Sequence, residues 1–490
     1  MDRLRSRRGP GTGVDGDAPV RMSYGKVLAI LALTGFYLLL VYMLPMKLRL
    51  VFLAMLLFPL LLLVKLRPEP WLLAVPFLIL LGGAKFSVGQ FFPAVLTVAV
   101  FLFFVLYLAD RLLWNRPMVR PWLPVKLTVA ALAVQVVTIF ISIHVQGQYT
   151  WNAIREGSSV FLFMPLIYIV PDLCRSREKV KRVTRSLLLA LLAASLLGVF
   201  EYFTTQGFSR VDLGLGYVYR GRVASFLGNP NVFAGFLELT IPLALAIALS
   251  EKSLPWKLVS FAGVILGIMS VLFTFSRGGL ASMLLGCAIV LVYWYRRRIW
   301  IPITIGLLFV GVMVRYSSVF ERQLSFFSNP SELVHQPTLL HRYVTYKGLV
   351  TQIERSPVIG VGWGSRSYFW GGTKIYSFWE VRHTVSSQMI RNFGGLNNLI
   401  LTHLVRAGII GLTALLLIFS AVVAASVKLL RKCPSPWGIG ISAGMAGFFL
   451  HQTMDNFLHW EQTNCLFWFI LGLAGAAWSV FGERKDKTSA

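Results

Sequence analysis

The sequence contains 490 residues, of which 56% are hydrophobic and only 14% are charged. Soluble domains contain about 25% charged residues and disordered chains are poor in apolar ones, so the composition excludes both classes. The net charge of +27 could indicate nucleic-acid binding, so the positions of the basic residues along the chain must be considered first.

Apolar runs long enough to cross a membrane recur from one end of the chain to the other. They predict an all-α polytopic membrane protein with about 12–14 transmembrane helices, because the third run is short enough to be re-entrant or tilted. The runs cover 26–45, 48–64, 71–84, 91–111, 121–145, 157–173, 183–203, 231–250, 255–275, 279–295, 299–316, 399–427, 436–452 and 460–481.

The lysines and arginines between these runs predict the orientation of the chain. With the N-terminus in the cytoplasm, alternating links place 29 of the 47 basic residues on the cytoplasmic side, and an even number of spans brings the C-terminus there too. The basic excess is therefore a topology signal in a protein of the cytoplasmic (inner) membrane, with attraction to anionic lipid, and nucleic acid is not an expected partner. The expected parts are a cytoplasmic tail at 1–25, a transmembrane bundle at 26–316, a large extracytoplasmic helical loop at 317–396, transmembrane helices at 397–481 and a cytoplasmic tail at 482–490.

The large loop carries signals of ordered structure. An amphipathic pattern over 339–357 predicts a helix that ends at Pro357, and glycines at 360, 362 and 364 then permit a tight turn. Aromatic residues are concentrated there and fit either a membrane-interface belt or a sugar-binding surface. These aromatic residues are Trp363, Tyr368, Phe369, Trp370, Tyr376, Phe378 and Trp379.

Four arginines lie on the extracytoplasmic side, where the topology rule disfavours them. Arg220 and Arg222 precede the sequence GNPN, Arg277 lies in FTFSRGG between two spans, and Arg342 lies in the loop helix. A guanidinium offers a rigid fork of donors that suits phosphate, so these residues are candidate pyrophosphate ligands. The alternative, that each snorkels to lipid phosphate or pairs with a carboxylate, is weakest for Arg277, since a charge between two apolar spans is costly.

Glu238 is a carboxylate inside the apolar run 231–250. It predicts either a structural partner for a nearby arginine, which we favour, or a proton or cation site of a transporter. His451 and Asp455 are four residues apart and would share a helix face if the span 436–452 extends that far, although a plain interface role is favoured for them. The cysteines fall in spans and cytoplasmic links, so neither a disulfide nor a zinc site is expected, and no metal or other cofactor is implied.

Four sequences in order resemble the O-antigen ligase/polymerase-like superfamily, which includes O-antigen ligases, polysaccharide polymerases and protein O-oligosaccharyltransferases. They are GRVASFLGNPNVFAGFL, FTFSRGG, HRYVTYKGLVTQIERSPVIGVGWG and NNLILTHLVRAGIIGL, within about 200–415. The resemblance implies metal-independent, inverting transfer of a glycan from polyprenyl (undecaprenyl) pyrophosphate to a hydroxyl acceptor at the outer leaflet. The family's pyrophosphate-binding arginines correspond to Arg277 and Arg342, with Arg222 as a third candidate. Asn231, in GNPN, is expected to support the site together with Glu238.

One position departs from the family pattern. Family ligases begin the segment after the loop with a His-Asn pair, and the histidine is the proposed general base; this sequence has Asn397 and Asn398. An amide does not take up a proton near neutral pH, so a general-base contribution of about 10²–10⁴-fold is missing there. His403 is a poor substitute, because six residues along a helix it points in another direction. The other candidate bases are His341, His383 and Glu380.

Two further explanations stay open. In the first, no base is used, Asn397 orients the acceptor with Asn398 supporting it, and catalysis relies on stabilising the leaving group. In the second, the chain is not a transferase but a transporter of a small anion or lipid-linked saccharide, or an inactive relative that binds the glycan lipid. The absence of an inverted repeat disfavours the transporter. The expected partners are the lipid-linked glycan donor, a hydroxyl acceptor on glycan, lipid or protein, and membrane lipid.

Overall fold

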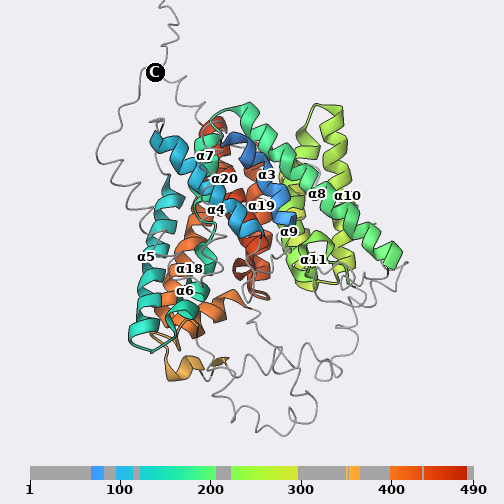
Figure 1. Ribbon diagram of the computed structural model, residues 1–490. Helices are drawn as coiled ribbons and strands as arrows, with labels where there is room; N and C mark the ends of the chain where they lie inside the picture. The colour runs from blue at the N-terminus through green and yellow to red at the C-terminus, as the bar shows by residue number, and fades with distance from the viewer. Residues whose placement is uncertain are drawn as a thin grey trace, which may run out of the picture. The chain divides into compact units, whose positions relative to one another are not determined.

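The computed structural model describes residues 68–81, 95–113, 122–205, 222–295, 349–350, 352–364, 398–432 and 435–482. The regular structure in these ranges is helical throughout, and eight described segments are long and apolar enough to cross a membrane, one of them the continuous stretch Thr150–Leu173 that comprises α6, η2 and α7. The expectation of an all-α polytopic membrane protein is therefore confirmed. The helices are α3 (Glu69–Leu80), α4 (Val95–Leu113), α5 (Leu123–His144), α6 (Thr150–Ser158), α7 (Leu166–Leu173), α8 (Arg177–Thr205), α9 (Pro230–Ser250), α10 (Leu254–Thr274), α11 (Arg277–Tyr295), α18 (Leu399–Lys432), α19 (Pro436–Gln452) and α20 (Glu461–Phe481), with short 3-10 turns η2 (Ser159–Phe161), η4 (Ser225–Leu227) and η7 (Phe457–His459) (Figure 1).

The observed helices follow the predicted spans wherever the structure describes them. The short third run forms α3, which has 12 residues and contains Pro76. The run 157–173 differs from the expected single helix, because α6 ends at Ser158 and α7 begins only after the turn η2. The runs predicted at 26–45, 48–64 and 299–316 lie outside the described residues.

The chain divides into two compact units. The smaller comprises residues 1–68 and 104–118, and its described part is mainly the second half of α4. There the Arg111 guanidinium lies over the Tyr107 ring, 5.3 Å from the centroid, and 3.7 Å from the Asp110 carboxylate. The larger unit comprises residues 69–103 and 119–490 and contains the other described helices.

Helix α9 is the most buried candidate span of the larger unit, with 94% of its apolar window inside the protein. It packs against α10, α11 and α19, so it faces protein instead of lipid. The sequence GNPN explains where it begins. Gly228 adopts a left-handed φ of +76°, the Asn229 side chain accepts hydrogen bonds from the first-turn backbone, and Pro230 stands where no N–H is needed.

Helix α18, which packs along α5, is broken at Gly408, whose φ and ψ are 61° and −155°. This combination is essentially restricted to glycine. Residues 357–362, which follow the loop helix, lie in the break and supply the hydrogen bonds that it interrupts. The bonds run from Val361 N to Val405 O (2.8 Å), Gly362 N to Arg406 O (2.9 Å), Ile409 N to Pro357 O (3.0 Å) and Ile410 N to Val358 O (3.4 Å).

We expect Gly408→Ala to destabilise the protein strongly. An added Cβ would lie 2.2 Å from the backbone oxygen of Val358, so the inserted segment would have to leave the break. Gly147→Ala is the matched control, because Gly147 has nearly the same φ, +63°, with nothing within 4 Å of an added Cβ. The control should cost only about 1–2 kcal/mol of backbone strain. Thermal unfolding of the purified variants in detergent measures both, and equal losses would contradict the packing at the break.

Candidate functional site

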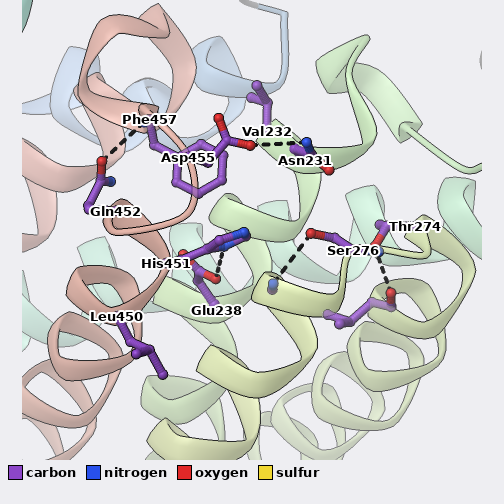
Figure 2. A network of polar contacts seen from close by, with 12 residues as sticks. Asn231, Val232, Glu238, Thr274, Ser276, Leu450, His451, Gln452, Asp455 and Phe457 are labelled. Carbon is purple, nitrogen blue, oxygen red and sulfur yellow. Dashed lines mark hydrogen bonds and ion pairs between the residues drawn. The ribbon is translucent and has the colours of Figure 1, made fainter. Parts of the chain in front are cut away.

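The first turn of α9 connects an arginine to a carboxylate. Arg222 donates from Nε to the backbone oxygen of Thr274 and from Nη2 to Asn231 Oδ1, both at 2.7 Å. Asn231 in turn donates from Nδ2 to Asp455 Oδ2 at 3.0 Å (Figure 2). The Asn231 amide therefore has its oxygen toward the cation and its nitrogen toward the anion, which fixes both side chains.

Arg277 is the first residue of α11, and its side chain is exposed. The helix is capped by Ser276, whose hydroxyl accepts a hydrogen bond from the backbone of Gly279 at 3.3 Å (Figure 2). Because Arg222 is bonded to the backbone of Thr274, it is held at the same short link that leads into Arg277. The Arg222 side chain is thus bonded to the backbone three residues before Arg277.

An imidazole–carboxylate pair packs against this first turn of α11. His451 Nδ1 and Glu238 Oε2 are 2.7 Å apart, and the two residues are 3% and 0% exposed (Figure 2). A Cβ on Gly278 would lie 2.5 Å from His451 Nε2, and a Cβ on Gly279 would lie 2.5 Å from the Cβ of Ala234. The two glycines of FTFSRGG therefore allow α11 to approach α9 and α19 closely.

The turn 451–456, which begins with the last two residues of α19, connects this site to α18. Asn398, just before α18, donates from its side chain to the Thr453 backbone oxygen at 2.7 Å. Asn456 donates from Nδ2 to Thr402 Oγ1 at 3.1 Å. With the contacts of His451 and Asp455, the turn touches the starts of α9, α11 and α18, so three of the four motifs converge on it.

A second polar cluster fixes the segment that follows the loop helix. Arg406 Nη2 lies 2.6 Å from Glu156 Oε1, and the arginine side chain is only 5% exposed. The other oxygen of Glu156 accepts the backbone N–H of Gly364 at 2.7 Å. Trp363 is fully buried and donates from Nε1 to Thr138 Oγ1 at 3.0 Å. Trp363 is thus a core residue, and neither role expected for the loop aromatics, interface belt or sugar surface, applies to it.

Two buried histidines pack beside the Trp363 ring. The His403 and His459 rings lie 5.3 Å and 6.1 Å from it, centroid to centroid. His403 Nδ1 lies 3.0 Å from the Leu399 backbone oxygen, and His459 Nδ1 lies 2.7 Å from Ser159 Oγ. Burial, reinforced by the neighbouring His403 and the Arg406 cation, lowers the pKa of His459 to about 3, so its imidazole is neutral at physiological pH.

The structure describes half of the predicted site residues and brings four of them together. Arg222 and Asn231 are bonded at the first turn of α9, Glu238 further along α9 contacts His451, which packs against the turn that begins at Arg277, and Asn398 joins them through the turn 451–456. The remaining predicted residues lie outside the described part of the chain. They are Arg220, His341, Arg342, His383 and Asn397.

Sequence reasoning missed how these contacts are made. The partner of Glu238 is His451, whereas the favoured expectation was an arginine. Asp455 lies beyond the end of α19 at Gln452, so it shares no helix face with His451 and instead binds Asn231. The sequence marks this region as unusual, because the polar stretch HQTMDN interrupts a long apolar one, but it does not identify these partners.

Within the described residues, no group of three or more His, Cys, Asp or Glu side chains is arranged to hold a metal ion. Three cysteines are described, and all are buried and unbridged. Burial raises the pKa of the Cys174 thiol to about 12, so this thiol is not a nucleophile at neutral pH. The described side chains at the site are arginines, amides, the Asp455 carboxylate and the imidazole–carboxylate pair.

One comparison with known families bears on the interpretation of this site. Residues 262–416 match the family model Wzy_C, described as O-antigen ligase. This segment, just under a third of the chain, includes Arg277, Arg342 and Asn397. The resemblance to the O-antigen ligase/polymerase-like superfamily is confirmed, and the match supports a membrane glycosyltransferase of ligase or polymerase type. No curated protein matches the sequence.

We expect the Arg406–Glu156 pair, in which the arginine side chain is 5% and the carboxylate side chain 26% exposed, to be coupled. Glu156→Gln leaves the buried Arg406 cation without its partner, which typically costs about 3–5 kcal/mol; Arg406→Met leaves a partly exposed carboxylate and should cost less, and the double variant should lose less than the sum. The exposed pair Lys181–Glu178, at 3.3 Å, is the control, and its coupling should be below about 1 kcal/mol. Unfolding free energies of the purified variants test this, and additive losses at Arg406 and Glu156 would show that the pair does not hold the segment.

Proposed function

We propose that the protein transfers a glycan from a polyprenyl diphosphate carrier, in the class of undecaprenyl pyrophosphate, to a hydroxyl acceptor on the extracytoplasmic face of the inner membrane. The acceptor oxygen attacks the anomeric carbon, the bond from that carbon to the diphosphate oxygen breaks, and the hydroxyl proton leaves to a base or to water. Attack opposite the leaving group inverts the anomeric centre. The products are the extended glycan and free polyprenyl diphosphate, and no metal is assigned to the step.

The observation that carries this proposal is the junction of Arg222 and Arg277. Both are attached to the link between α10 and α11, one by a hydrogen bond to Thr274 and the other by its place in the chain. A diphosphate leaving group gains negative charge as the glycosidic bond breaks, so guanidinium groups held nearby stabilise the transition state more than the ground state. Arg342, within the matched family segment, is the expected third member, and Arg220 lies two residues before Arg222.

Contacts between links support the proposed sidedness. The links predicted to be extracytoplasmic touch one another: Gln146 donates to the backbone oxygen of Gly360, Asn398 to that of Thr453, and Arg222 to that of Thr274. Links predicted to be cytoplasmic also touch helix ends predicted to share their side. Lys179 lies 2.6 Å from Glu69, and Arg177 lies over the Phe481 ring. This pairing is consistent with the proposed grouping of the links on two sides of the membrane, and the assignment of both termini to the cytoplasm rests on the distribution of basic residues.

Because residue 397 is an asparagine, another group must take the proton of the acceptor hydroxyl. We propose that leaving-group stabilisation by arginine carries most of the rate, with Asn397 orienting the acceptor and a loop histidine, His383 or His341, taking the proton. Asn398 holds this position against the turn 451–456.

A transporter remains the second candidate, and one observation favours it. Glu238 and His451 form a fully buried protonatable pair in the helical bundle, which is what a proton-coupled carrier needs. In that case the lipid-linked glycan or anion would cross the bilayer chemically unchanged.

Substitution of the arginines tests the proposal. In cells that lack the gene, glycan should accumulate on the polyprenyl carrier, and Arg277→Ala or Arg342→Ala should fail to clear it, with transfer reduced about 100-fold or more. Arg155→Ala is the control, because Arg155 is an exposed arginine on α6, on the same proposed side of the membrane. Carrier-linked glycan is measured by mass spectrometry in strains with equal amounts of inserted protein. Full clearance by both the Arg277 and Arg342 variants would remove the diphosphate role.

Restoring the family residue tests the account of the proton. Asn397→His should raise the transfer rate and make it depend less on His383 and His341, since a histidine there is the family's proposed general base. In the parent protein, His383→Ala or His341→Ala should lower the rate about 10²-fold. Transfer rates measured in membrane vesicles separate the two explanations. No loss in either single variant would favour transfer without a general base.

A further inference from the structure

The first turn of α11 rests on the His451 ring. A Cβ on Gly278 would lie 2.5 Å from both Cδ2 and Nε2 of that ring, and a Cβ on Gly279 would lie 3.4 Å from its Cε1. Contacts under 3.0 Å force something to move, so the ring fills the space that a side chain at position 278 would need. The backbone position of the turn that begins at Arg277 is therefore set by where this imidazole lies (Figure 2).

The imidazole itself is fixed on two further sides. Glu238 Oε2, at 2.7 Å from Nδ1, sets its orientation, and the Phe457 ring stands edge-on to it with centroids 4.5 Å apart. Glu238 is fully buried in α9, the most enclosed span of the described helices. A buried carboxylate is costly inside a bundle and is retained where it does a specific task. Among the described residues, its carboxylate contacts the His451 imidazole, which lies against the start of α11.

The other arginine is fixed from the same turn. Asp455, four residues after His451, holds Asn231, and Asn231 holds Arg222. One short segment thus sets the backbone that carries Arg277 and the side chain of Arg222. Two cations that bind one diphosphate must be held at a defined separation, because a misplacement of about 1 Å costs up to about 10²-fold in rate.

We propose that His451 and Glu238 are positioning residues that set the first turn of α11, and with it the distance of Arg277 from Arg222, for a diphosphate ligand. The inference rests on the proposed function for its ligand, and on the contacts at Gly278 for its geometry. On this proposal the SRGG motif and the HQTMDN turn together fix the relative positions of Arg277 and Arg222. Neither residue is required to touch the substrate.

The geometry is tested first, without substrate. A spin label attached through Arg277→Cys in the full-length protein in nanodiscs reports the mobility of the first turn of α11. We expect His451→Ala and Glu238→Ala to make the label clearly more mobile and Glu238→Gln to change it little, because the glutamine amide can keep the bond to Nδ1 whichever of the two groups donates. Glu69→Ala, which breaks the pair with Lys179 elsewhere in the larger unit, is the control and should leave the label unchanged. Unchanged mobility in His451→Ala would overturn the proposal.

A steric test uses Gly278→Ala, which keeps the histidine and therefore applies even if His451→Ala fails to fold. Gly278→Ala places a methyl group on the ring and should displace the turn while leaving the Glu238 contact intact. Combined with His451→Ala, it should be no worse than His451→Ala alone, because the atoms that it strikes are gone. Strictly additive effects of the two changes on label mobility would contradict the contact. Label mobility that Gly278→Ala leaves unchanged would contradict it too.

Binding of the ligand is tested separately. With Arg277 restored, the Kd for polyprenyl diphosphate in nanodiscs should rise about 10- to 100-fold in Gly278→Ala and Glu238→Ala, and much less in Glu238→Gln. Wild-type protein that binds no polyprenyl diphosphate would contradict the proposed function, while the label still judges the positioning role. Displacement of the label with unchanged Kd in both variants would overturn the link between this pair and the diphosphate.

Discussion

The contact between Glu238 and His451 is the interaction on which the arrangement of the site depends. It joins α9, the most enclosed span, to the end of α19, and the same imidazole bears on the start of α11. Neither partner is easily replaced, since removing one leaves the other as an uncompensated polar group in the bundle. The turn that follows His451 then reaches Asn231 and Asn398. Motifs far apart in the sequence are therefore held together by one short polar segment.

A second constraint fixes the segment that leaves the loop helix. The break of α18 at Gly408 exposes backbone groups that the neighbouring segment satisfies, and the Arg406–Glu156 pair and the buried Trp363 hold that segment in place. The sequence VIGVGWG is thus a structural insert, with glycines where the backbone turns or approaches another chain segment closely. Together with Asn398, it attaches both described flanks of 365–397 to the helical bundle.

Much of the fold was predictable because lipid imposes a simple rule on composition. Apolar runs predicted most of the described helices to within a few residues, although α6 was not among them, and GNPN is the capped start of α9 because asparagine and proline suit those positions. The contacts of the site were not predictable. Whether Glu238 meets an arginine or His451, and whether Trp363 faces a sugar or the core, depends on how separate helices pack, and spacing along the chain carries no information about that.

The central claim is that the protein breaks the bond between a glycan and its diphosphate carrier, and reconstitution tests it most directly. Purified protein in proteoliposomes is supplied with a glycan-diphosphate-polyprenol and a hydroxyl acceptor, and the lipid products are followed by mass spectrometry. The account predicts release of free polyprenyl diphosphate in a one-to-one ratio with glycan transferred, and loss of both in Arg277→Ala. Movement of the intact glycan lipid across the bilayer, with no free polyprenyl diphosphate formed, would contradict it.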